Sequence, residues 1–379
     1  MCCSGKNIKS DRCGSLGIFM VVCEMNIVFI WTGVTSYMAD CWRALSRMPG
    51  VRLKIYIQEK AQAGTRFNQA EVLEGLDTVL LYENEFLDKD KIRSQIVGFQ
   101  PTVFFIVGWR ARLPRFFALD RSFLSVPKVL IFDLPFAWTL KKLIAPIVLY
   151  PYLRRFKVAF VPGRCASQYA RWLGFRGSKI KEGLFSLNVS TLSAGVQEVV
   201  ERRGFLFVAR YVRDKRLDIL VGAYKKYRKR VEYDAKETCW TLTCCGMGSY
   251  EKWIENVDGV ENRGFLQPNE IRALYKTHGA LVLTSDYETW GMVIAEACAS
   301  GLPVICTKAC GSHIELVKEN GFVCETNDVD AIAEAMFQIH TMRNEERITM
   351  GMKGLDRVRP YSCEVWTERV AQITSSLAR

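Results

Sequence analysis

The sequence predicts an α/β protein with two doubly wound domains, each built on a parallel sheet. Short apolar runs alternate with helical patterns through both halves of the chain. This alternation is typical of parallel sheets with crossover helices on both faces. A serine-containing stretch without clear periodicity, residues 186–203, separates the two series and predicts an interdomain linker. The length of 379 residues suits two or three domains, and a hydrophobic content of 49% is sufficient for large cores.

The first residues of the chain differ in character from the remainder. Residues 1–24 contain one short apolar run, 17–22, which is too short to span a bilayer and precedes no small-residue cleavage pattern. Met25 begins the run MNIVFIW, which predicts a buried first strand. We therefore expect residues 1–24 to be a disordered or mis-assigned leader, and residues 25–185 to form the N-terminal domain.

The N-terminal series continues from that first strand. Gly33 lies in a flexible turn, and Ser36 is a candidate N-cap for a helix that ends before Pro49. Further strands are expected at 51–57, 78–82, 102–107, 128–132 and 158–161, with helices at 89–97 and 135–150. Ligands of such sheets lie at the carboxyl ends of the strands. This rule selects Gly33, residues 108–110 and Asp133.

Asp133 has two interpretations. An aspartate directly after a strand often caps the following helix. A carboxylate at this edge of the sheet is also placed to exchange a proton with a substrate. The residues alone leave both roles open.

A second αβ series begins at residue 204. Strands are expected at 204–209, 238–244, 279–283 and from 304, and a helix rich in Lys and Arg runs to about residue 230. Gly246 belongs to a G-x-G turn, which is a weak signal for dinucleotides because no G-x-G-x-x-G is present. A final helix is expected near the C-terminus, at 362–377.

The stretch from Thr284 to Gly311 is the most informative in the chain. Glu288 follows a buried strand, Gly291 opens a helix, and Glu296 lies in the second turn of that helix. The bare N–H groups and the dipole at such a helix start favour a phosphate. Two solvated glutamates on an ordinary αβ unit would explain this spacing alone. Here the pair occurs together with W-G-M-V and with G-L-P-V at residues 301–304.

This combination resembles the donor-binding signature of retaining glycosyltransferases of the family 4 type. That family has the GT-B fold, in which two Rossmann-like domains face each other across a cleft. The resemblance covers nearly everything from Met25 to the end and is strongest over 204–340. It implies that residues 204–357 bind a nucleotide-diphosphate sugar and that 358–379 cross back as a helix onto the N-terminal domain. The acceptor would enter from the N-terminal domain.

The resemblance also implies roles for individual residues. Arg210 and Lys215 would clamp the donor diphosphate, and two such cations stabilise a departing phosphate without a metal ion. Glu288 would accept sugar hydroxyls, and Glu296 ribose hydroxyls. Many members place a histidine in the first domain, but the histidines here are His278, His313 and His340, so Asp133 is the candidate replacement. The remaining donor-binding candidates are Gly33, Gly246, Phe265, Leu266, Gly291, Met292 and Val293.

No cofactor and no metal are expected. The nearest candidate for a metal set consists of Cys306, Cys310 and His313, with Cys324 further on, but structural zinc sites favour more closely paired ligands. The 14 cysteines are scattered through apolar segments, which favours reduced thiols in a cytoplasmic protein.

The formal net charge of +12 is concentrated in the middle of the chain. Residues 101–230 contain 26 Lys and Arg against 7 Asp and Glu. Basic residues there alternate with aromatics around Trp109 or flank an apolar helix: Arg110, Arg112, Arg115, Lys141, Lys142, Arg154, Arg155 and Lys157. Such a face is able to hold an anionic membrane at roughly 1 kcal/mol per basic residue, or it is a solvated face over a buried helix.

The favoured function is therefore transfer of a sugar to a glycan or lipid-linked acceptor, with retention, in cell-surface polysaccharide or lipopolysaccharide synthesis. The expected location is cytoplasmic, or peripheral on the inner face of the membrane. A sugar-nucleotide epimerase of the same fold remains an alternative. A basic nucleic-acid-binding protein is a second one, but no helix-turn-helix, zinc or aromatic-platform motif accompanies the charge, so no nucleic-acid partner is expected. A nicotinamide oxidoreductase is disfavoured because the glycine fingerprint is missing.

Overall fold

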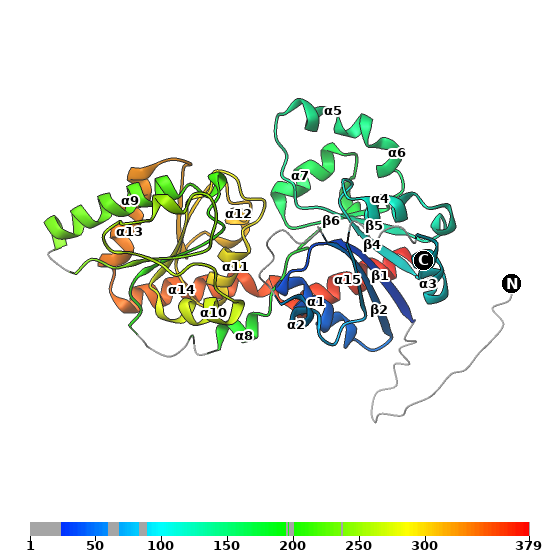
Figure 1. Cartoon of the computed structure of the whole chain (residues 1–379), viewed down its shortest axis with the longest axis horizontal. Coiled ribbons are helices and arrows are strands. Elements are labelled where there is room, and N and C mark those ends of the chain that lie inside the picture. The colour runs from blue at the N-terminus through cyan, green and yellow to red at the C-terminus, as the bar shows by residue number, and fades with distance from the viewer. Residues whose placement is uncertain are drawn as a thin grey trace, which may run out of the picture.

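The computed structural model describes residues 24–59, 68–82, 89–194, 196, 201–235 and 238–378. These residues form two α/β domains that lie next to each other (Figure 1). Apart from Glu24, the expected leader lies outside the described residues.

The N-terminal domain is built on a parallel sheet, whose described strands follow the order β3-β2-β1-β4-β5-β6-β7. The order reverses direction between β1 and β4, which is the point where doubly wound sheets bind ligands. The strands are β1 (Met25–Thr32), β2 (Val51–Glu59), β3 (Thr78–Tyr82), β4 (Val103–Val107), β5 (Lys128–Ile131), β6 (Val158–Val161) and β7 (Ile180–Glu182).

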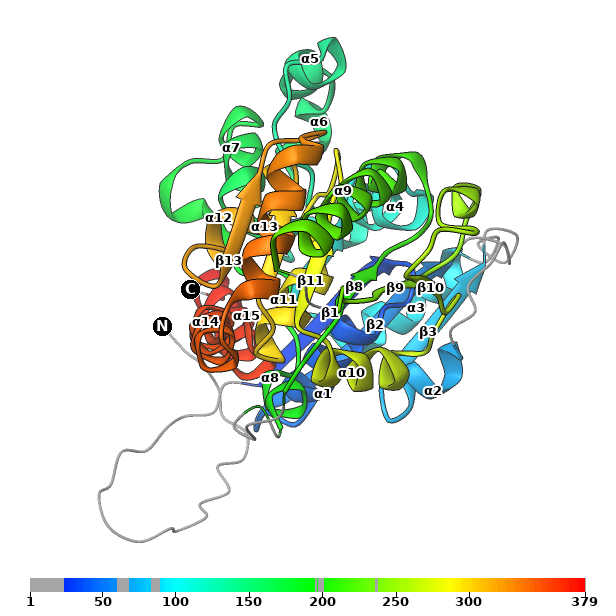
Figure 2. The ribbon, with the colours of Figure 1, turned by 90° about the vertical axis from the view of Figure 1, so that its left-hand side faces the viewer.

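Helices cover both faces of this sheet, as its connections require (Figure 1). Helix α5 follows the loop after β5 and stands out from the rest of the domain, as Figure 2 also shows. The helices are α1 (Ser36–Ser46), α2 (Gln69–Leu73), α3 (Lys89–Phe99), α4 (Arg112–Leu119), α5 (Leu140–Val148), α6 (Tyr150–Leu153) and α7 (Arg164–Trp172).

The C-terminal domain repeats this plan with the strand order β10-β9-β8-β11-β12-β13, again parallel among the described residues. Its switch point lies between β8 and β11. The strands are β8 (Phe205–Val208), β9 (Leu242–Cys245), β10 (Val260–Asn262), β11 (Ala280–Leu283), β12 (Val304–Thr307) and β13 (Gly321–Cys324). The helices are α9 (Leu217–Arg230), α10 (Pro268–Thr277), α11 (Met292–Ala299), α12 (His313–Leu316), α13 (Val329–Thr341) and α14 (Asn344–Val358).

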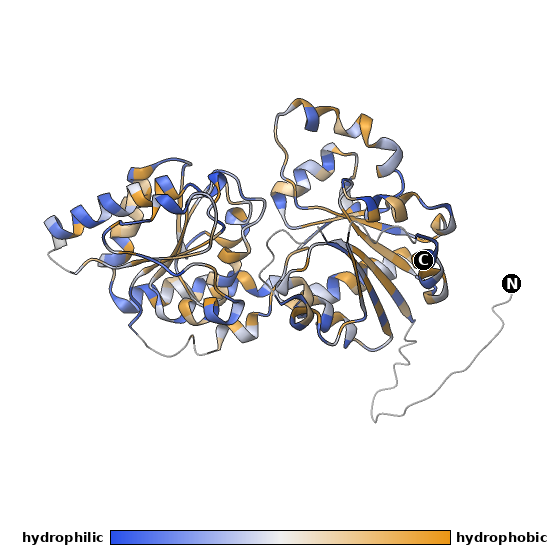
Figure 3. Ribbon diagram, in the orientation of Figure 1, coloured by the Kyte–Doolittle hydropathy of each residue, from blue (hydrophilic) through white to orange (hydrophobic). Residues whose placement is uncertain are grey.

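The central strands are apolar on both faces because helices cover both faces. Ile27, Val28, Phe29 and Ile30 are all fully buried, although their side chains alternate between the two faces. Figure 3 shows hydrophobic residues concentrated on the strands of both sheets. The prediction of an α/β protein with two doubly wound domains, each built on a parallel sheet, is confirmed.

The chain passes between the domains twice. Helix α8 (Val189–Ser193) lies on the first passage, and α15 (Cys363–Leu377) follows the second and packs on α1 of the N-terminal domain. The two passages are hydrogen-bonded to each other: Leu187 donates its N–H to the carbonyl of Tyr361 at 3.0 Å, and Cys363 donates to the carbonyl of Leu187 at 3.1 Å.

Several predicted boundaries were wrong. The strand expected at 238–244 begins at Leu242, because the preceding residues lead to Trp240, which packs against Phe205 and His340 outside the sheet. The helix expected at 135–150 begins at Leu140, after an N-cap at Thr139. The N-cap of α1 is Thr35 instead of Ser36. The linker contains α8, which a short serine-containing segment did not indicate.

No helix in the described residues combines the length and the apolar character needed to cross a bilayer.

Candidate active site

A cavity of about 580 Å³ lies between the two domains. This volume is in the usual range for small-molecule sites. The N-terminal domain contributes residues of α1, and the C-terminal domain contributes the carboxyl ends of β8 and β9 together with α10 and α11. The residues that line it are Ser36, Tyr37, Asp40, Leu187, Asn188, Leu192, Val208, Ala209, Arg210, Cys245, Gly246, Met247, Phe265, Leu266, Pro268, Ile271, Arg272, Tyr275, Val293 and Glu296.

Lys215 and Glu288 form an ion pair at the switch point of the C-terminal sheet. The Nζ atom of Lys215 lies 2.5 Å from Oε2 of Glu288. Lys215 follows β8 and Glu288 follows β11, and these strands are neighbours in the sheet, so their carboxyl ends bring the two side chains together. Both side chains are largely buried, with 10% and 21% exposed. Arg210 comes from the same loop as Lys215 and lines the cavity.

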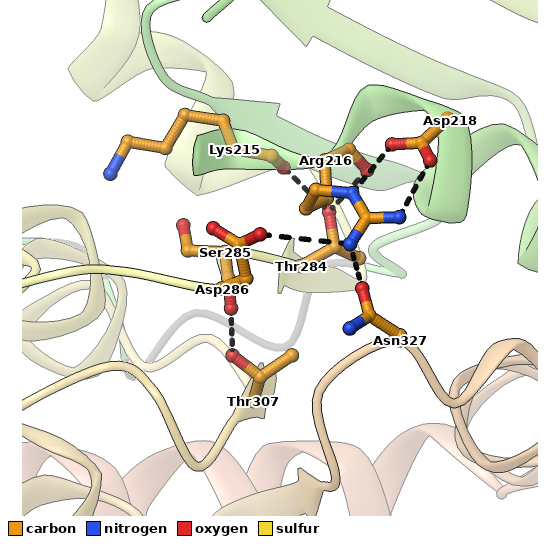
Figure 4. A network of polar contacts seen from close by, with 8 residues as sticks. All are labelled: Lys215, Arg216, Asp218, Thr284, Ser285, Asp286, Thr307 and Asn327. Atoms are coloured by element: carbon orange, nitrogen blue, oxygen red, sulfur yellow. Dashed lines mark hydrogen bonds and ion pairs between the residues drawn. The ribbon is translucent and has the colours of Figure 1, made fainter. Parts of the chain in front are cut away.

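A network of polar contacts fixes the two loops that hold this ion pair (Figure 4). Thr284, at the end of β11, donates its hydroxyl to the carbonyls of Lys215 and Arg216, at 3.0 and 3.2 Å. The backbone of Asp286 donates to the carbonyl of Asp214 at 2.9 Å. Arg216 donates from Nε and Nη2 to the two carboxylate oxygens of Asp218, at 2.9 and 2.7 Å. The positions of Lys215 and Glu288 are thus set by the loops' backbones.

Helix α11 begins at Gly291, next to Glu288. The φ angle of Gly291 is +90°, a left-handed conformation that favours glycine. The first N–H groups of α11 therefore lie close to the ion pair, where they are suited to an anion. Gly311 packs closely against the backbone of the loop that contains Glu288. A Cβ at position 311 would lie only 2.1 Å from the carbonyl oxygen of Thr289.

Glu296 lies on α11 and lines the cavity from the C-terminal domain. Tyr275 of α10 donates its hydroxyl to Oε2 of Glu296 at 2.8 Å. Burial raises the pKa of the Glu296 carboxyl, and the Tyr275 hydrogen bond partly opposes this shift. One oxygen of Glu296 is held by Tyr275, and the carboxylate can accept further hydrogen bonds from a ligand hydroxyl.

Asp133 connects the N-terminal domain to this site. Thr289, the neighbour of Glu288, donates its hydroxyl to Oδ2 of Asp133 at 2.9 Å. Burial raises the pKa of the Asp133 carboxyl, the Thr289 hydrogen bond lowers it, and the charge of Glu288 raises it further. Asp133 therefore lies within the electrostatic reach of Glu288 and faces the C-terminal domain. The helix after it begins only at Leu140, whose N-cap is Thr139, so Asp133 is not a helix cap here.

The remaining predicted residues differ in how close they lie to the cavity. Gly246, Phe265, Leu266 and Val293 line it. Gly246 must be glycine, because its φ is +155° and a Cβ would lie 1.8 Å from the carbonyl oxygen of Ala209. The described residues that line the cavity do not include Gly33, Asp133, Lys215, Glu288, Gly291 or Met292. Gly33 instead directly follows β1, three residues before Ser36, which lines the cavity together with Tyr37. Met292 is the first residue of α11.

Some residues of the site could not be recognised from the sequence. Tyr37 lies on the cavity wall, and burial raises the pKa of its hydroxyl. Thr289 and Tyr275 orient two of the predicted carboxylates. Each of them lies next to or within a predicted element, but no local pattern indicates which residue contacts which. Arg272 and Asp40, on opposite walls of the cavity, carry no sequence signal either.

The predicted set of Cys306, Cys310, His313 and Cys324 lies within the described residues. No group of three or more His, Cys, Asp or Glu side chains in the described residues has a metal-binding arrangement. Cys306 and Cys310 are both buried, and His313 donates from Nδ1 to the carbonyl of Cys310 at 2.8 Å.

The arrangement suits a ligand with one anionic and one hydroxylated part. Arg210, Lys215 and the start of α11 supply positive charge and N–H donors, which bind phosphates. Glu288 and Glu296 supply acceptors for hydroxyl groups. Gly246, Phe265 and Leu266 line the same cavity.

Residues 191–354 match the family model described as Glycosyl transferases group 1. Two uncharacterised glycosyltransferases of Methanocaldococcus jannaschii are similar in sequence. The first is 31% identical over 150 residues, which is 37% of this chain and 36% of that protein. The second is 25% identical over 273 residues, 69% of this chain and 72% of that protein. The chain thus aligns with about a third of the first relative's length and most of the second's.

Among solved structures, Anabaena HepE in complex with UDP and glucose has a TM-score of 0.67 and 15% identity, and the match covers 92% of this chain and 99% of that chain. At this identity the likeness shows the fold. The chain therefore has the GT-B fold, and its residues 191–354 are similar to the group 1 glycosyltransferase domain.

Proposed function

We propose that this protein is a glycosyltransferase of the family 4 type that moves a sugar from a nucleotide-diphosphate sugar to a glycan or lipid-linked acceptor. The observation that supports this most directly is the Lys215–Glu288 ion pair, together with Arg210 and Glu296 from the adjoining loop and helix, which line the cavity. Cations and hydroxyl acceptors are thereby brought to one edge of the sheet, as the binding of a sugar–phosphate group would require. The group 1 domain covers the same residues.

In this proposal the diphosphate contacts Arg210, Lys215 and the start of α11. Lys215 must then exchange part of its contact with Glu288 for the phosphate, which frees Glu288 to accept the sugar hydroxyls. Glu296 accepts the ribose hydroxyls and stays oriented by Tyr275. As the sugar–oxygen bond breaks, the growing charge on the phosphate is stabilised by the two cations, without a metal ion.

The acceptor hydroxyl would approach from the N-terminal domain, on the side of Asp133. Retention of configuration is part of the proposal because the Glu288–Glu296 motif resembles that of retaining enzymes. The departing phosphate oxygen would take the acceptor proton on the same face of the sugar, and Asp133 would help to orient the acceptor. Closure of the domains around the cavity would exclude water and limit hydrolysis.

The first test is a thermal-shift panel with UDP, GDP and ADP, and with NADH as a decoy. UDP is the leading candidate because the similar HepE structure contains it. A nucleoside diphosphate at a hundred times its Kd stabilises a protein by about 2.7 kcal/mol. Arg210→Ala should weaken that binding about 10- to 100-fold, since it removes a charged hydrogen bond of about 1.5–3 kcal/mol.

Lys226→Ala is the matched control, because Lys226 lies on the outer helix α9 and pairs with Asp330 away from the cavity. It should keep the full shift. Stabilisation by NADH alone, or by duplex nucleic acid and no nucleotide, would contradict the proposal. Conversion of a donor to its epimer without any acceptor would favour the epimerase alternative.

Two finer parts of the proposal have their own tests. Metal independence predicts unchanged turnover after chelation with EDTA, and a loss restored by Mg²⁺ or Mn²⁺ would refute it. Retention predicts a product with the anomeric configuration of the donor, which the coupling constant of the new anomeric proton reveals.

The proposed biological setting is cell-surface polysaccharide or lipopolysaccharide synthesis, with the protein cytoplasmic or peripheral at the inner face of a membrane. What supports it is the basic charge of residues 134–181, which belong to the N-terminal, acceptor-side domain and contain ten Lys and Arg but no Asp or Glu. An anionic membrane surface would be the partner of that charge. Fractionation of cells that express the full chain would show whether it associates with membranes and leaves them at high salt.

A further inference from the structure

Exposed apolar side chains gather at one helix of the N-terminal domain. In α5 only Ala145 is buried. Five large apolar side chains on the helix and its flanks are between 63% and 81% exposed, namely Trp138, Leu140, Ile147, Val148 and Tyr150. Figures 1 and 2 show α5 standing out at the edge of the molecule. Contiguous exposed apolar surface of this kind marks an interaction site.

The protein holds this helix in place from the other side. Thr139 caps it, and Lys142 donates from Nζ to the carbonyl of Pro135 at 2.5 Å while lying over the ring of Tyr169. Trp172 of α7 donates its indole N–H to the carbonyl of Lys142 at 2.9 Å. The helix is thus attached by its backbone and by Lys142, which leaves its apolar side chains directed outward.

The charge of the surrounding chain is of one sign. Residues 134–181 contain ten Lys and Arg and not a single Asp or Glu. Lys141, Arg154 and Lys157, close to α5 in sequence, are exposed. Apolar side chains next to uncompensated positive charge are the pattern of a surface that enters the head-group region of an anionic membrane.

We propose that α5 and its flanking residues, 138–150, insert into the interface of a bilayer that contains anionic phospholipids. This proposal rests on the proposed function and adds to it the helix through which the protein binds the membrane. Trp138 and Tyr150 suit the depth of the head groups, where aromatic residues are enriched. Leu140, Ile147 and Val148 would lie against the acyl chains.

Charge argues against the other occupants. A second copy of this chain would bring the same basic segment to the contact, and like charges across an interface are unfavourable. Nucleic acid would satisfy the charge but offers little to the apolar side chains. A bilayer with anionic lipids satisfies both.

The position of α5 gives the docking a consequence for the reaction. Residues 134–139 join it directly to Asp133, which contacts Thr289 of the donor-side loop. Docking through α5 therefore brings the acceptor side of the cleft to the membrane surface. An acceptor attached to a membrane lipid would then need to extend only a short distance from the membrane surface to reach the sugar.

The test is co-sedimentation of the full chain with vesicles of phosphatidylcholine and phosphatidylglycerol in equal amounts, and with vesicles of phosphatidylcholine alone. Wild type should bind the anionic vesicles at low salt and release them at high salt. The double variant Trp138→Ser, Ile147→Ser should bind at least about tenfold more weakly, because insertion strength scales with buried apolar area. Lys141→Ala should weaken binding about fivefold.

Tyr233→Ser is the matched control, because Tyr233 is 84% exposed but lies on the C-terminal domain. It should bind like wild type. The proposal is overturned if wild type stays in the supernatant at low salt, or if the double variant sediments as well as wild type. A dimer in light scattering that dissociates in the double variant would assign the surface to a second copy and equally overturn it.

The nucleotide thermal shift, measured on the same preparations, separates this proposal from the proposed function. The double variant should keep the shift, which also shows that it is folded. Vesicle binding without any nucleotide shift would count against the transferase proposal and leave the docking intact. A nucleotide shift without vesicle binding would overturn the docking proposal and leave the transferase proposal intact.

Discussion

The carboxyl edges of the two sheets meet at the same cleft, but they are built differently. At the C-terminal edge, Lys215 and Glu288 are paired, and Thr284 fixes the backbone that holds Lys215. At the N-terminal edge, Asp133 reaches across to the partner domain through Thr289, and the chain beyond it leads out to an exposed helix. A donor half that is ordered before binding suits a ligand of constant shape. A more open acceptor half suits one that arrives from elsewhere.

Among the changes that test this difference between the two edges, the largest effect on activity is expected at Lys215. Lys215→Ala should lower the rate of transfer about 10²- to 10³-fold, as expected when one donor to a developing anion is removed. It also leaves Glu288 without its cation, so donor binding should weaken as well. The measurement is kcat and KM for the donor with the best nucleotide from the thermal-shift panel.

Lys308→Ala provides the control for that experiment, because Lys308 pairs with Glu325 in an exposed position. Its activity should remain within about twofold of wild type, since exposed pairs contribute little. A Lys215→Ala enzyme with normal turnover would show that the ordered donor edge has no catalytic role.

A smaller effect is expected where the donor edge is held together. Thr284→Val keeps the shape but removes the hydroxyl that donates to the carbonyls of Lys215 and Arg216. It should cost about 1–3 kcal/mol of unfolding free energy, because buried carbonyls lose their donor. Displacement of Lys215 should reduce turnover about tenfold.

Thr374→Val separates the two consequences. Thr374 is equally buried but lies on α15, where its hydroxyl donates to the carbonyl of Val370 at 2.9 Å. This variant should lose stability, as measured by urea denaturation, and keep its turnover. Equal loss of turnover in both threonine variants would mean that the network serves stability alone.

The smallest predicted effect concerns the acceptor edge and depends on pH. Burial raises the pKa of Asp133, so folding favours its protonated form. Its contribution to stability is present below the ordinary aspartate pKa and is lost as pH rises through the folded value. Asp133→Asn should therefore be more stable than wild type at pH 7, and the difference should shrink as pH falls through the raised pKa of Asp133 toward the ordinary aspartate value of about 4.

Asp218→Asn should show the opposite sign. The Arg216 hydrogen bond lowers the pKa of Asp218, so ionised Asp218 stabilises the fold above the ordinary aspartate range. The variant should be less stable than wild type at pH 7, with the difference again fading in acid. Urea denaturation between pH 3 and pH 8, roughly the span of these titrations, measures both curves. The same sign for both variants would contradict the contrast between the two edges.

The elements of the fold that could be predicted are those with a periodic pattern of apolar residues in their own sequence. The strand expected at 78–82 is observed as Thr78–Tyr82, and the helix expected after Gly291 is observed as Met292–Ala299. Such elements arise from patterns within a few residues. Elements whose extent depends on distant partners were harder to predict. Trp240 lies outside β9 because it packs against α13 through His340, and no local pattern shows this.

The same limit applies to the site. The sequence indicated Lys215 and Glu288 through a motif, yet their direct ion pair results from the neighbourhood of β8 and β11, which only the fold provides. Asp133 and Thr289 are 156 residues apart, and their contact depends on how the domains meet. The basic segment was apparent from composition. That α5 exposes its apolar side instead of burying it was one of two open interpretations.

The two passages between the domains are hydrogen-bonded to each other at one place. Because Leu187 and the 361–363 segment are hydrogen-bonded to each other, the domains are joined by a short two-stranded ribbon instead of by a single segment of chain. A ribbon of this kind bends more readily than it slides along itself. Opening and closing of the cleft would thus take one path, and each closure would return Asp133 to the same position over Thr289.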